Sequence, residues 1–179
     1  MTAPRALAPV LRGEARVRRA QAEQWMLQAA ESCNTAGMEW TDQGVAVLTV
    51  GRVWDVVRAP YTVLDGSFDR GTAPQQLRRR VDALQVSGAV FCDPYRPFLY
   101  FLVPPGTDQH WPHDGGPAGV ECLGGTRPYI HHIGVPRLDY ISPPGLFWLV
   151  PPDNGGPRLT DPAHLYKVLH ALKTQPVIA

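Results

Sequence analysis

The sequence lacks the features that direct a chain to a membrane or to secretion. Nothing in it approaches the roughly 18 consecutive apolar residues of a membrane span. The N-terminal stretch MTAPRALAPVLRGEARVRR also lacks the apolar segment and cleavage site of a secretory signal. We therefore expect a cytoplasmic protein that makes no contact with a membrane.

Cysteine is scarce, and the usual catalytic motifs are missing. The three cysteines, Cys33, Cys92 and Cys122, are widely spaced and form no CxxC pair, so neither a disulfide framework nor a zinc knuckle is indicated. We expect reduced, mostly buried thiols. No GxSxG, Walker A or GxGxxG motif is present either.

The chain has little net charge. Its 17 basic and 16 acidic residues give a formal charge of +1, which argues against nonspecific polyanion binding by the whole surface. Local patches are still allowed, and two arginine clusters could contact phosphates or form solvated faces. The binding candidates in these clusters are Arg16, Arg19, Arg78, Arg79 and Arg80.

What the sequence does contain is typical of one globular domain. Its 179 residues, 44% of them hydrophobic, are enough for one core. We expect residues 1–12, which include Pro4 and Pro9, to be a flexible tail and residues 13–179 to be the domain. The abundant prolines and glycines of the second half favour short strands joined by tight turns.

The periodicity of apolar residues predicts helices and strands in a segregated order. We expect helices over 13–34, where Asn34 and Gly37 would end the helix, and over 73–85, where Thr72 and Gln75 would form a capping box. A third helix should begin after Asp161, an N-cap followed by proline. Between the first two helices, the runs 45–50 and 52–57 read as two strands, or as one strand bent at Gly51.

Five further short strands are expected between the second and third helices. They correspond to the stretches GAVFCD, PFLYFLVPPG, GVECLGG, PYIHHIGVP and LFWLVPPD, and the residues PYRP form the turn between the first two. The order predicts an α+β fold in which a mixed or antiparallel sheet of short strands is flanked by about three helices.

One carboxylate stands in an apolar strand, in the stretch RVWDVVRAP. Nucleotidyl transfer by two metal ions needs clustered carboxylates, and a strand supplies them at alternate positions of one face. The position two residues after Asp55 is Val57, so the same-face acid is missing. Because a buried carboxylate is costly unless it is paired, Arg52 or Arg58 could neutralise it, or Asp55 could keep a ligand role.

The histidines form no convincing metal site. Pro112 excludes a regular helix over His110 and His113, so we expect exposed loop histidines there. His131 and His132 are neighbours on a predicted strand and therefore face opposite sides. One of them should lie in the core or in an interface.

Several short sequence motifs resemble those of a known family. In VWDVVRA, Asp55 matches the first acid of an hhhDhD or hhhDhE strand, and Val57 occupies the second position. PYRPFLYFLV matches an apolar strand that follows an sGGxH motif, although Phe98 stands where the histidine would be. Glu121 in GVECLGG offers a third acid. Over about residues 20–172 the chain thus resembles the actinobacterial members of the bifunctional DNA primase/polymerase N-terminal family, a branch of the archaeo-eukaryotic primase superfamily.

The resemblance implies a primase-polymerase-like fold whose active site has been degraded. The second acid and the nucleotide-contacting histidine are gone, and Tyr95 and Arg96 replace the glycines of the motif. Losing a ligand from a two-metal centre should severely reduce activity. The resemblance therefore favours a catalytically inactive module that binds single-stranded nucleic acid, a nucleotide, a protein partner or a second copy of itself.

An alternative is an enzyme with a rearranged site. It would place a divalent metal, Mg or Mn by analogy with the family, among Asp55, Glu121 and one of His131 or His132, and would have a nucleotidyltransferase-like activity. A surface for assembly is a further alternative, because aromatic residues gather near turns. These aromatic residues are Trp111, Tyr129, Tyr140, Phe147 and Trp148.

Overall fold

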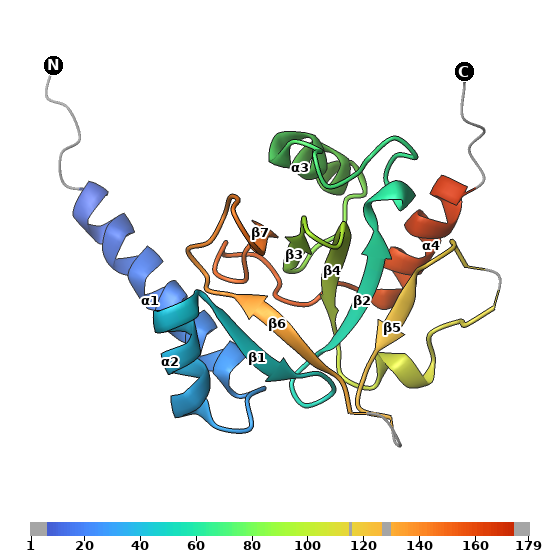
Figure 1. The fold of residues 1–179 in the computed structure, drawn as a ribbon. Helices are drawn as coiled ribbons and strands as arrows, with labels where there is room; N and C mark the ends of the chain where they lie inside the picture. Colours follow the sequence, from blue (N-terminus) through green and yellow to red (C-terminus); the bar gives the residue numbers. More distant parts are fainter. Residues whose placement is uncertain (1–6, 115, 127–129, 174–179) are drawn as a thin grey trace, which may run out of the picture.

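The structure is a computed structural model that describes residues 7–114, 116–126 and 130–173 (Figure 1). The described helices are α1 (Leu7–Leu27), α2 (Cys33–Gln43), α3 (Pro74–Ala83) and α4 (Pro162–Lys173), with short 3-10 turns at η1 (Tyr61–Val63) and η2 (Thr107–Gln109). The described strands are β1 (Val45–Thr49), β2 (Asp55–Pro60), β3 (Val90–Asp93), β4 (Phe98–Val103), β5 (Glu121–Leu123), β6 (His132–Pro136) and β7 (Phe147–Val150).

The strands form two antiparallel sheets. Five of them lie in the order β5-β2-β4-β3-β7, and β1 pairs with β6 in a separate two-stranded sheet. The expected α+β class with antiparallel strands is confirmed. Within the described residues there are four helices, one more than the sequence predicted.

The extra helix, α2, lies where the sequence predicted the end of the first helix. The prediction of one helix over 13–34 was wrong, because α1 ends at Leu27 and the Ser32 hydroxyl caps a new helix by accepting the Thr35 N–H at 3.3 Å. Glycine is only a weak helix breaker, so Gly37 is accommodated inside α2, where the burial of Trp40 favours the helix. Gly44, with φ of 73°, ends it.

The N-terminal boundary also differs from the prediction. We expected a tail over residues 1–12, but α1 already begins at Leu7. The first six residues of that predicted tail lie outside the described part of the chain.

The starts of the other two helices show one error and one confirmed prediction. The capping box expected for Thr72 and Gln75 was wrong: the Gln76 side chain accepts the Ala73 N–H at 3.2 Å instead. The reason is Pro74, which occupies the first helical position and moves the start by one residue. Asp161 does cap α4, because its Oδ1 accepts the Ala163 N–H at 3.0 Å.

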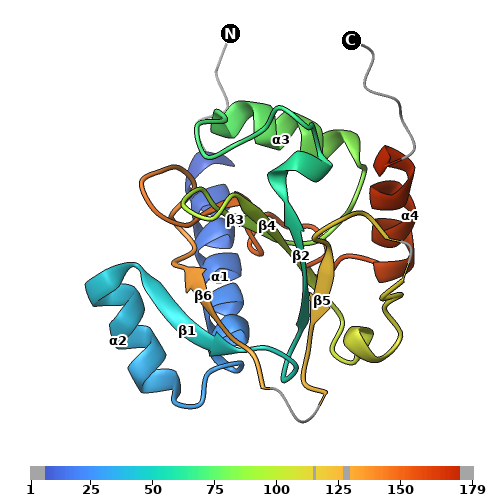
Figure 2. The same cartoon turned by 45° about the vertical axis from the view of Figure 1, so that its right-hand side comes forward.

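The five-stranded sheet is buried on both faces. Val56, Phe91 and Trp148 contribute to a core with α1, α2 and the small sheet, whereas their neighbours Val57 and Phe147 belong to a second core under α3 and α4. In both Figure 1 and Figure 2, α2 with β1 and β6 lies on the opposite side of β2 from α4. This double burial explains why the strands read as nearly continuous apolar runs.

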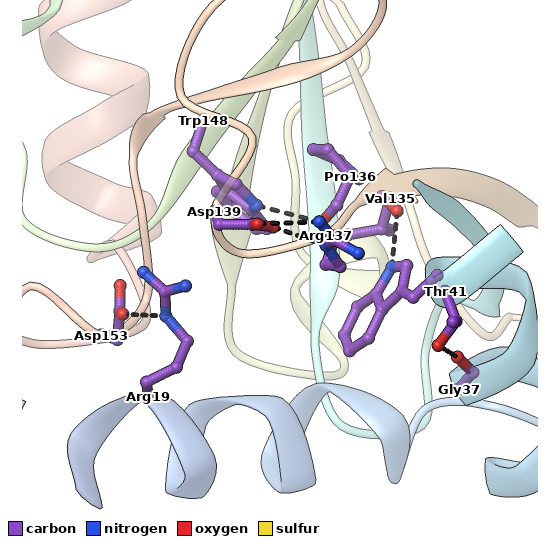
Figure 3. Close-up of polar contacts among 10 residues, drawn as sticks. Arg19, Gly37, Thr41, Val135, Pro136, Arg137, Asp139, Trp148 and Asp153 are labelled. Atoms are coloured by element: carbon purple, nitrogen blue, oxygen red, sulfur yellow. Dashed lines mark hydrogen bonds and ion pairs between the residues drawn. The ribbon is translucent and has the colours of Figure 1, made fainter. Parts of the chain in front are cut away.

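Two indoles tie β6 to the rest of the molecule. Trp40 Nε1 of α2 donates to the Val135 carbonyl at 2.9 Å. Trp148 Nε1 of β7 donates to the Pro136 carbonyl at 3.0 Å (Figure 3). Because both rings are buried, the first hydrogen bond fixes the small sheet to α2 and the second fixes it to the larger sheet.

Candidate functional site

Asp55 is the first residue of β2, and its side chain is fully buried. It shares a sheet face with Val57 and Ala59, as strand alternation requires. The expected neutralisation by arginine was wrong. Arg52 donates to the Ala30 carbonyl at 2.8 Å, and Arg58, at an odd offset from Asp55, points to the other face of the sheet.

The companion of Asp55 is Asp108, which the sequence analysis missed. The Asp108 N–H donates to Asp55 Oδ2 at 3.0 Å, and the two carboxyl groups are close enough that each shifts the pKa of the other. Asp108 lies in η2, just after β4, and the start of β2 pairs with the end of β4. The antiparallel register therefore brings the two acids to the same end of the sheet.

A third loop completes this corner. The Thr126 N–H donates to Asp108 Oδ2 at 3.0 Å. Gly124 leaves room for the carboxylate, since a Cβ there would lie 2.1 Å from Asp108 Cγ. The glycines of ECLGGT are thus required by close packing around Asp108.

The two acids have opposite pKa shifts. Burial raises the pKa of Asp55 to about 6, against the opposing effect of the Asp108 N–H and with a further increase from the negative charge of Asp108. Burial also acts to raise the pKa of Asp108, but hydrogen bonds with Thr126 and with Asp55 outweigh it and hold this pKa below the usual value. The Oδ1 atoms of both residues are buried and accept from no donor in the described part of the chain. A proton on Asp55, shared with Asp108, accounts for this pattern.

Cys122 faces this acid pair but is no nucleophile. Burial raises its pKa far above the usual range, and the charges of Asp55 and Asp108 raise it further. The thiol therefore stays protonated. Cys92 is likewise buried, burial raises its pKa to about 12, and its thiol contacts the Phe147 carbonyl. The expectation of mostly buried thiols holds for Cys92, whereas Cys122 is half-buried and Cys33 is exposed.

Glu121, the other predicted acid, lies on the opposite face of the sheet from Asp55. In the pairing of β5 with β2, Glu121 stands opposite Arg58, whereas Cys122 stands opposite Val57. Paired residues project to the same face, so Glu121 goes with Arg58, with which it forms an ion pair. The sheet therefore separates the two carboxylates that the resemblance implied as metal ligands.

The histidines do not complete a metal site. His132 Nε2 lies 3.3 Å from Glu31 Oε1 on the small sheet, and neither His132 nor His131 is buried in the core. His110 and His113 are exposed, as expected. No group of three or more potential ligands from His, Cys, Asp and Glu is placed to hold a metal ion in the part of the chain that the structure describes.

Three of the five predicted phosphate-binding arginines are engaged within the molecule. Arg19 pairs with Asp153 (Figure 3), Arg80 lies 2.6 Å from Asp65, and Arg78 donates to the carbonyls of Ile141 and Trp148. The other two, Arg16 and Arg79, are exposed. The clusters in the sequence are therefore partly structural anchors between helices and loops.

The aromatic residues near turns mostly belong to the cores. Phe147 and Trp148 are both buried, on opposite faces of β7. Trp111 is buried with its ring edge-on to Tyr166, and Tyr140 is half-buried against Arg137. Tyr129 lies outside the described residues.

A different surface combines aromatic rings with basic groups at the hairpin between β3 and β4. We call it the hairpin platform, and it consists of Arg58, Tyr95, Arg96 and Phe98 together with Tyr100, whose ring is buried in the core and stacked on Phe91. Asp93 Oδ1 shapes the turn by accepting the N–H groups of Tyr95 at 2.9 Å and of Arg96 at 3.3 Å. Tyr95 is left 71% exposed, so its ring is open to a ligand.

The strands hold the rest of the hairpin platform on one face of the sheet. Arg58 pairs with Tyr100 and Pro60 with Phe98 in the register of β2 and β4, so these side chains project together. The Arg58 guanidinium lies 4.7 Å from the centroid of the Phe98 ring. Burial raises the pKa of Tyr100, while the nearby Arg58 and Arg96 oppose that rise. Arg96 is thus close enough to add positive charge to the same surface.

The sequence contains a local signal for this surface. PYRPF includes the predicted turn PYRP and the replaced glycines of the motif, and aromatic and basic residues interleave in it. The contribution of Arg58 could not be read from the sequence, because it depends on the pairing of two strands.

A hollow of about 660 Å³ lies beside the acid pair, between η2 and the start of α4. Pro105, Trp111, Pro112 and Tyr166 give it mostly apolar walls, and His110 also lines it. The carboxylates of Asp55 and Asp108 do not line it, whereas Thr107 and Gln109, the neighbours of Asp108 in η2, do.

Two further observations concern membrane-spanning helices and similarity to known proteins. None of the helices within residues 7–114, 116–126 and 130–173 is long and apolar enough to cross a membrane. In comparisons with known proteins, no family model, curated protein or solved structure matches the chain.

Proposed function

We propose that this chain is a catalytically inactive primase-polymerase-like domain that binds single-stranded nucleic acid or nucleotide through the hairpin platform. The observation that carries the proposal is the Arg58 guanidinium stacked over Phe98, on the same sheet face as Tyr100, with the exposed Tyr95 in the hairpin turn that precedes Phe98. Both ligand classes share a base and a phosphate, which are the two groups that this surface suits.

The chemistry of the surface supports this assignment. Bases stack on aromatic side chains without regard to sequence, and sheet surfaces that carry aromatic residues serve this purpose in RNA-binding domains. Arginine adds contacts to phosphate and can itself stack on a base. Exposed Tyr95 and half-buried Phe98 offer ring faces, while Arg58 and Arg96 supply charge.

The inactive character is supported by the positions of the acids. Two-metal transfer needs carboxylates that share the ions, but Asp55 is buried against Asp108 and Glu121 projects from the other face. These residues do not fit a magnesium or manganese centre. The alternative enzyme around Asp55, Glu121 and His131 or His132 stays a prediction that this arrangement does not favour.

The proposal is tested by fluorescence anisotropy with labelled oligothymidine and with a labelled mononucleotide, each at low and at high salt. Tyr95→Ala is the decisive variant, since an exposed side chain can be removed without loss of the fold. We expect it to lower the affinity by about 1–3 kcal/mol, the usual contribution of one stacked base. Met38→Ala is the control, because it also removes an exposed side chain but lies far from Tyr95 in the sequence.

The outcomes separate the ligand classes. Binding of the oligonucleotide but not of the mononucleotide would assign the surface to single strands, and the reverse would assign it to nucleotides. Absence of binding to both at low salt would reject the proposal. The remaining alternatives would then be binding of a protein partner or formation of a homodimer. Sedimentation would test the homodimer.

A further inference from the structure

Glu121 occupies the charged end of the hairpin platform. Its carboxylate pairs with the Arg58 guanidinium across the β5–β2 pairing, and the two side chains are 45% and 34% exposed respectively. We propose that Glu121 is an intramolecular competitor that occupies Arg58 in the position of a ligand phosphate and must be displaced when the ligand binds. This inference rests on the proposed function.

The geometry makes Arg58 the group for which carboxylate and phosphate compete. The Phe98 ring holds the guanidinium from one side, and Arg58 Nε is buried without a hydrogen-bond acceptor in the described part of the chain. The outer nitrogen that pairs with Glu121 is therefore the part of the guanidinium that an external anion can reach. Carboxylate and phosphate oxygens accept from arginine in the same way.

Displacement of Glu121 is feasible because the ion pair is only partly buried. A pair that stays in contact with water is weak, since water solvates both charges and two long side chains lose freedom when they pair. A phosphate that approaches Arg58 also meets repulsion from the Glu121 carboxylate. Removing the charge of Glu121 should therefore strengthen phosphate binding, whereas a ligand without phosphate should gain nothing.

The different response of ligands with and without phosphate identifies the ligand class. A nucleoside would stack on the rings of the hairpin platform but would leave the ion pair intact. An oligonucleotide or a nucleotide would exchange one anion for another at Arg58. Glu121 would thus weaken the binding of ligands that bring a phosphate to Arg58 and would leave the stacking of neutral aromatic molecules unchanged.

The experiment measures the affinity of labelled oligothymidine and of thymidine triphosphate for the wild-type protein, Glu121→Gln and Glu14→Gln. The last variant removes the same charge from exposed Glu14 of α1, which lies on the opposite side of the molecule from β5 (Figure 1). We expect Glu121→Gln to bind about two- to fivefold more tightly, the range set by exposed ion pairs. Glu14→Gln should match the wild type, and the nucleoside thymidine should show no gain.

Two further variants show whether the effect acts through Arg58. In the double variant Glu121→Gln, Arg58→Gln the gain should disappear, and Glu121→Asp, with a shorter reach, should lie between wild type and Glu121→Gln. Thermal melting of each variant establishes that it is folded before its affinity is compared.

The failures of the two proposals are distinct. If the wild type binds and Glu121→Gln binds equally well, or if Glu14→Gln gains as much, the competitor role is overturned and the proposed function stands. If neither the wild type nor Glu121→Gln binds either ligand, the proposed function fails and the competitor role with it. Binding by Glu121→Gln alone would support both.

Discussion

Asp55 and Asp108 lie 53 positions apart in the chain, yet the N–H of Asp108 donates to the carboxylate of Asp55 and each side chain shifts the pKa of the other. The pair joins the start of β2 to the turn that follows β4. Its energetics depend on pH, which makes it open to experiment.

We expect Asp55→Asn to stabilise the protein at neutral pH. The folded state raises the pKa of Asp55 from 3.8 to about 6, so the folded protein binds this proton more tightly than the unfolded chain does. The stability contributed by Asp55 is therefore present below about pH 4 and is lost as the pH rises to about 6. Asparagine keeps the acceptor for the Asp108 N–H and offers its amide to the Asp108 carboxylate.

Urea denaturation across this pH range measures the effect. The variant should exceed the wild type on the order of 2 kcal/mol above about pH 6, and the difference should shrink toward pH 4. A difference that does not change with pH would contradict the shared proton.

Gly124→Ala should destabilise the same corner. The new methyl group would lie 2.1 Å from Asp108 Cγ, so the acid must move and its contact with Asp55 is broken. We expect a loss of about 1–3 kcal/mol, typical of overpacking, measured by thermal and chemical denaturation. Gly37→Ala is the control, because nothing lies within 4 Å of a Cβ there. In the middle of α2 it should raise stability by about 0.5–1 kcal/mol.

Trp40→Phe should loosen the small sheet. The substitution keeps most of the buried ring but leaves the Val135 carbonyl without the indole N–H at 2.9 Å. The loss of this one hydrogen bond costs about 0.5–1.5 kcal/mol. Hydrogen exchange should show faster opening of β1 and β6 than of β2 and β4. Equal acceleration throughout both sheets would mean that the indole does not anchor β6 specifically.

Arg96→Ala should weaken binding of oligothymidine at the hairpin platform more than Arg79→Ala does. Both residues are exposed arginines, so the two variants change the net charge equally. If Arg96 contacts a phosphate, its loss should lower the slope of log affinity against log salt by about 1. The same reduction from Arg79→Ala would move the binding surface to α3, where the sequence first placed it.

Local patterns predicted most of the elements. The Asp161-Pro162 start of α4 and the seven strands followed from capping residues and β-branched runs, because these signals act over a few neighbouring positions. The missed helix α2 shows the limit of such signals. Gly37 argued for a break, and only the burial of Trp40 between helix and sheet favours a helix there.

The features of the candidate sites could be predicted from the sequence to different degrees. Alternation along β2 by itself placed Asp55 on the face of Val57 and left it without an acid on its own strand, because side chains of a strand project with a period of two. The meeting of Asp55 with Asp108, and that of Arg58 with Glu121, depended on which strands pair and in which register. Those choices come from burying both faces of one sheet, and the residues concerned are distant in the chain, so only the tertiary structure decided them.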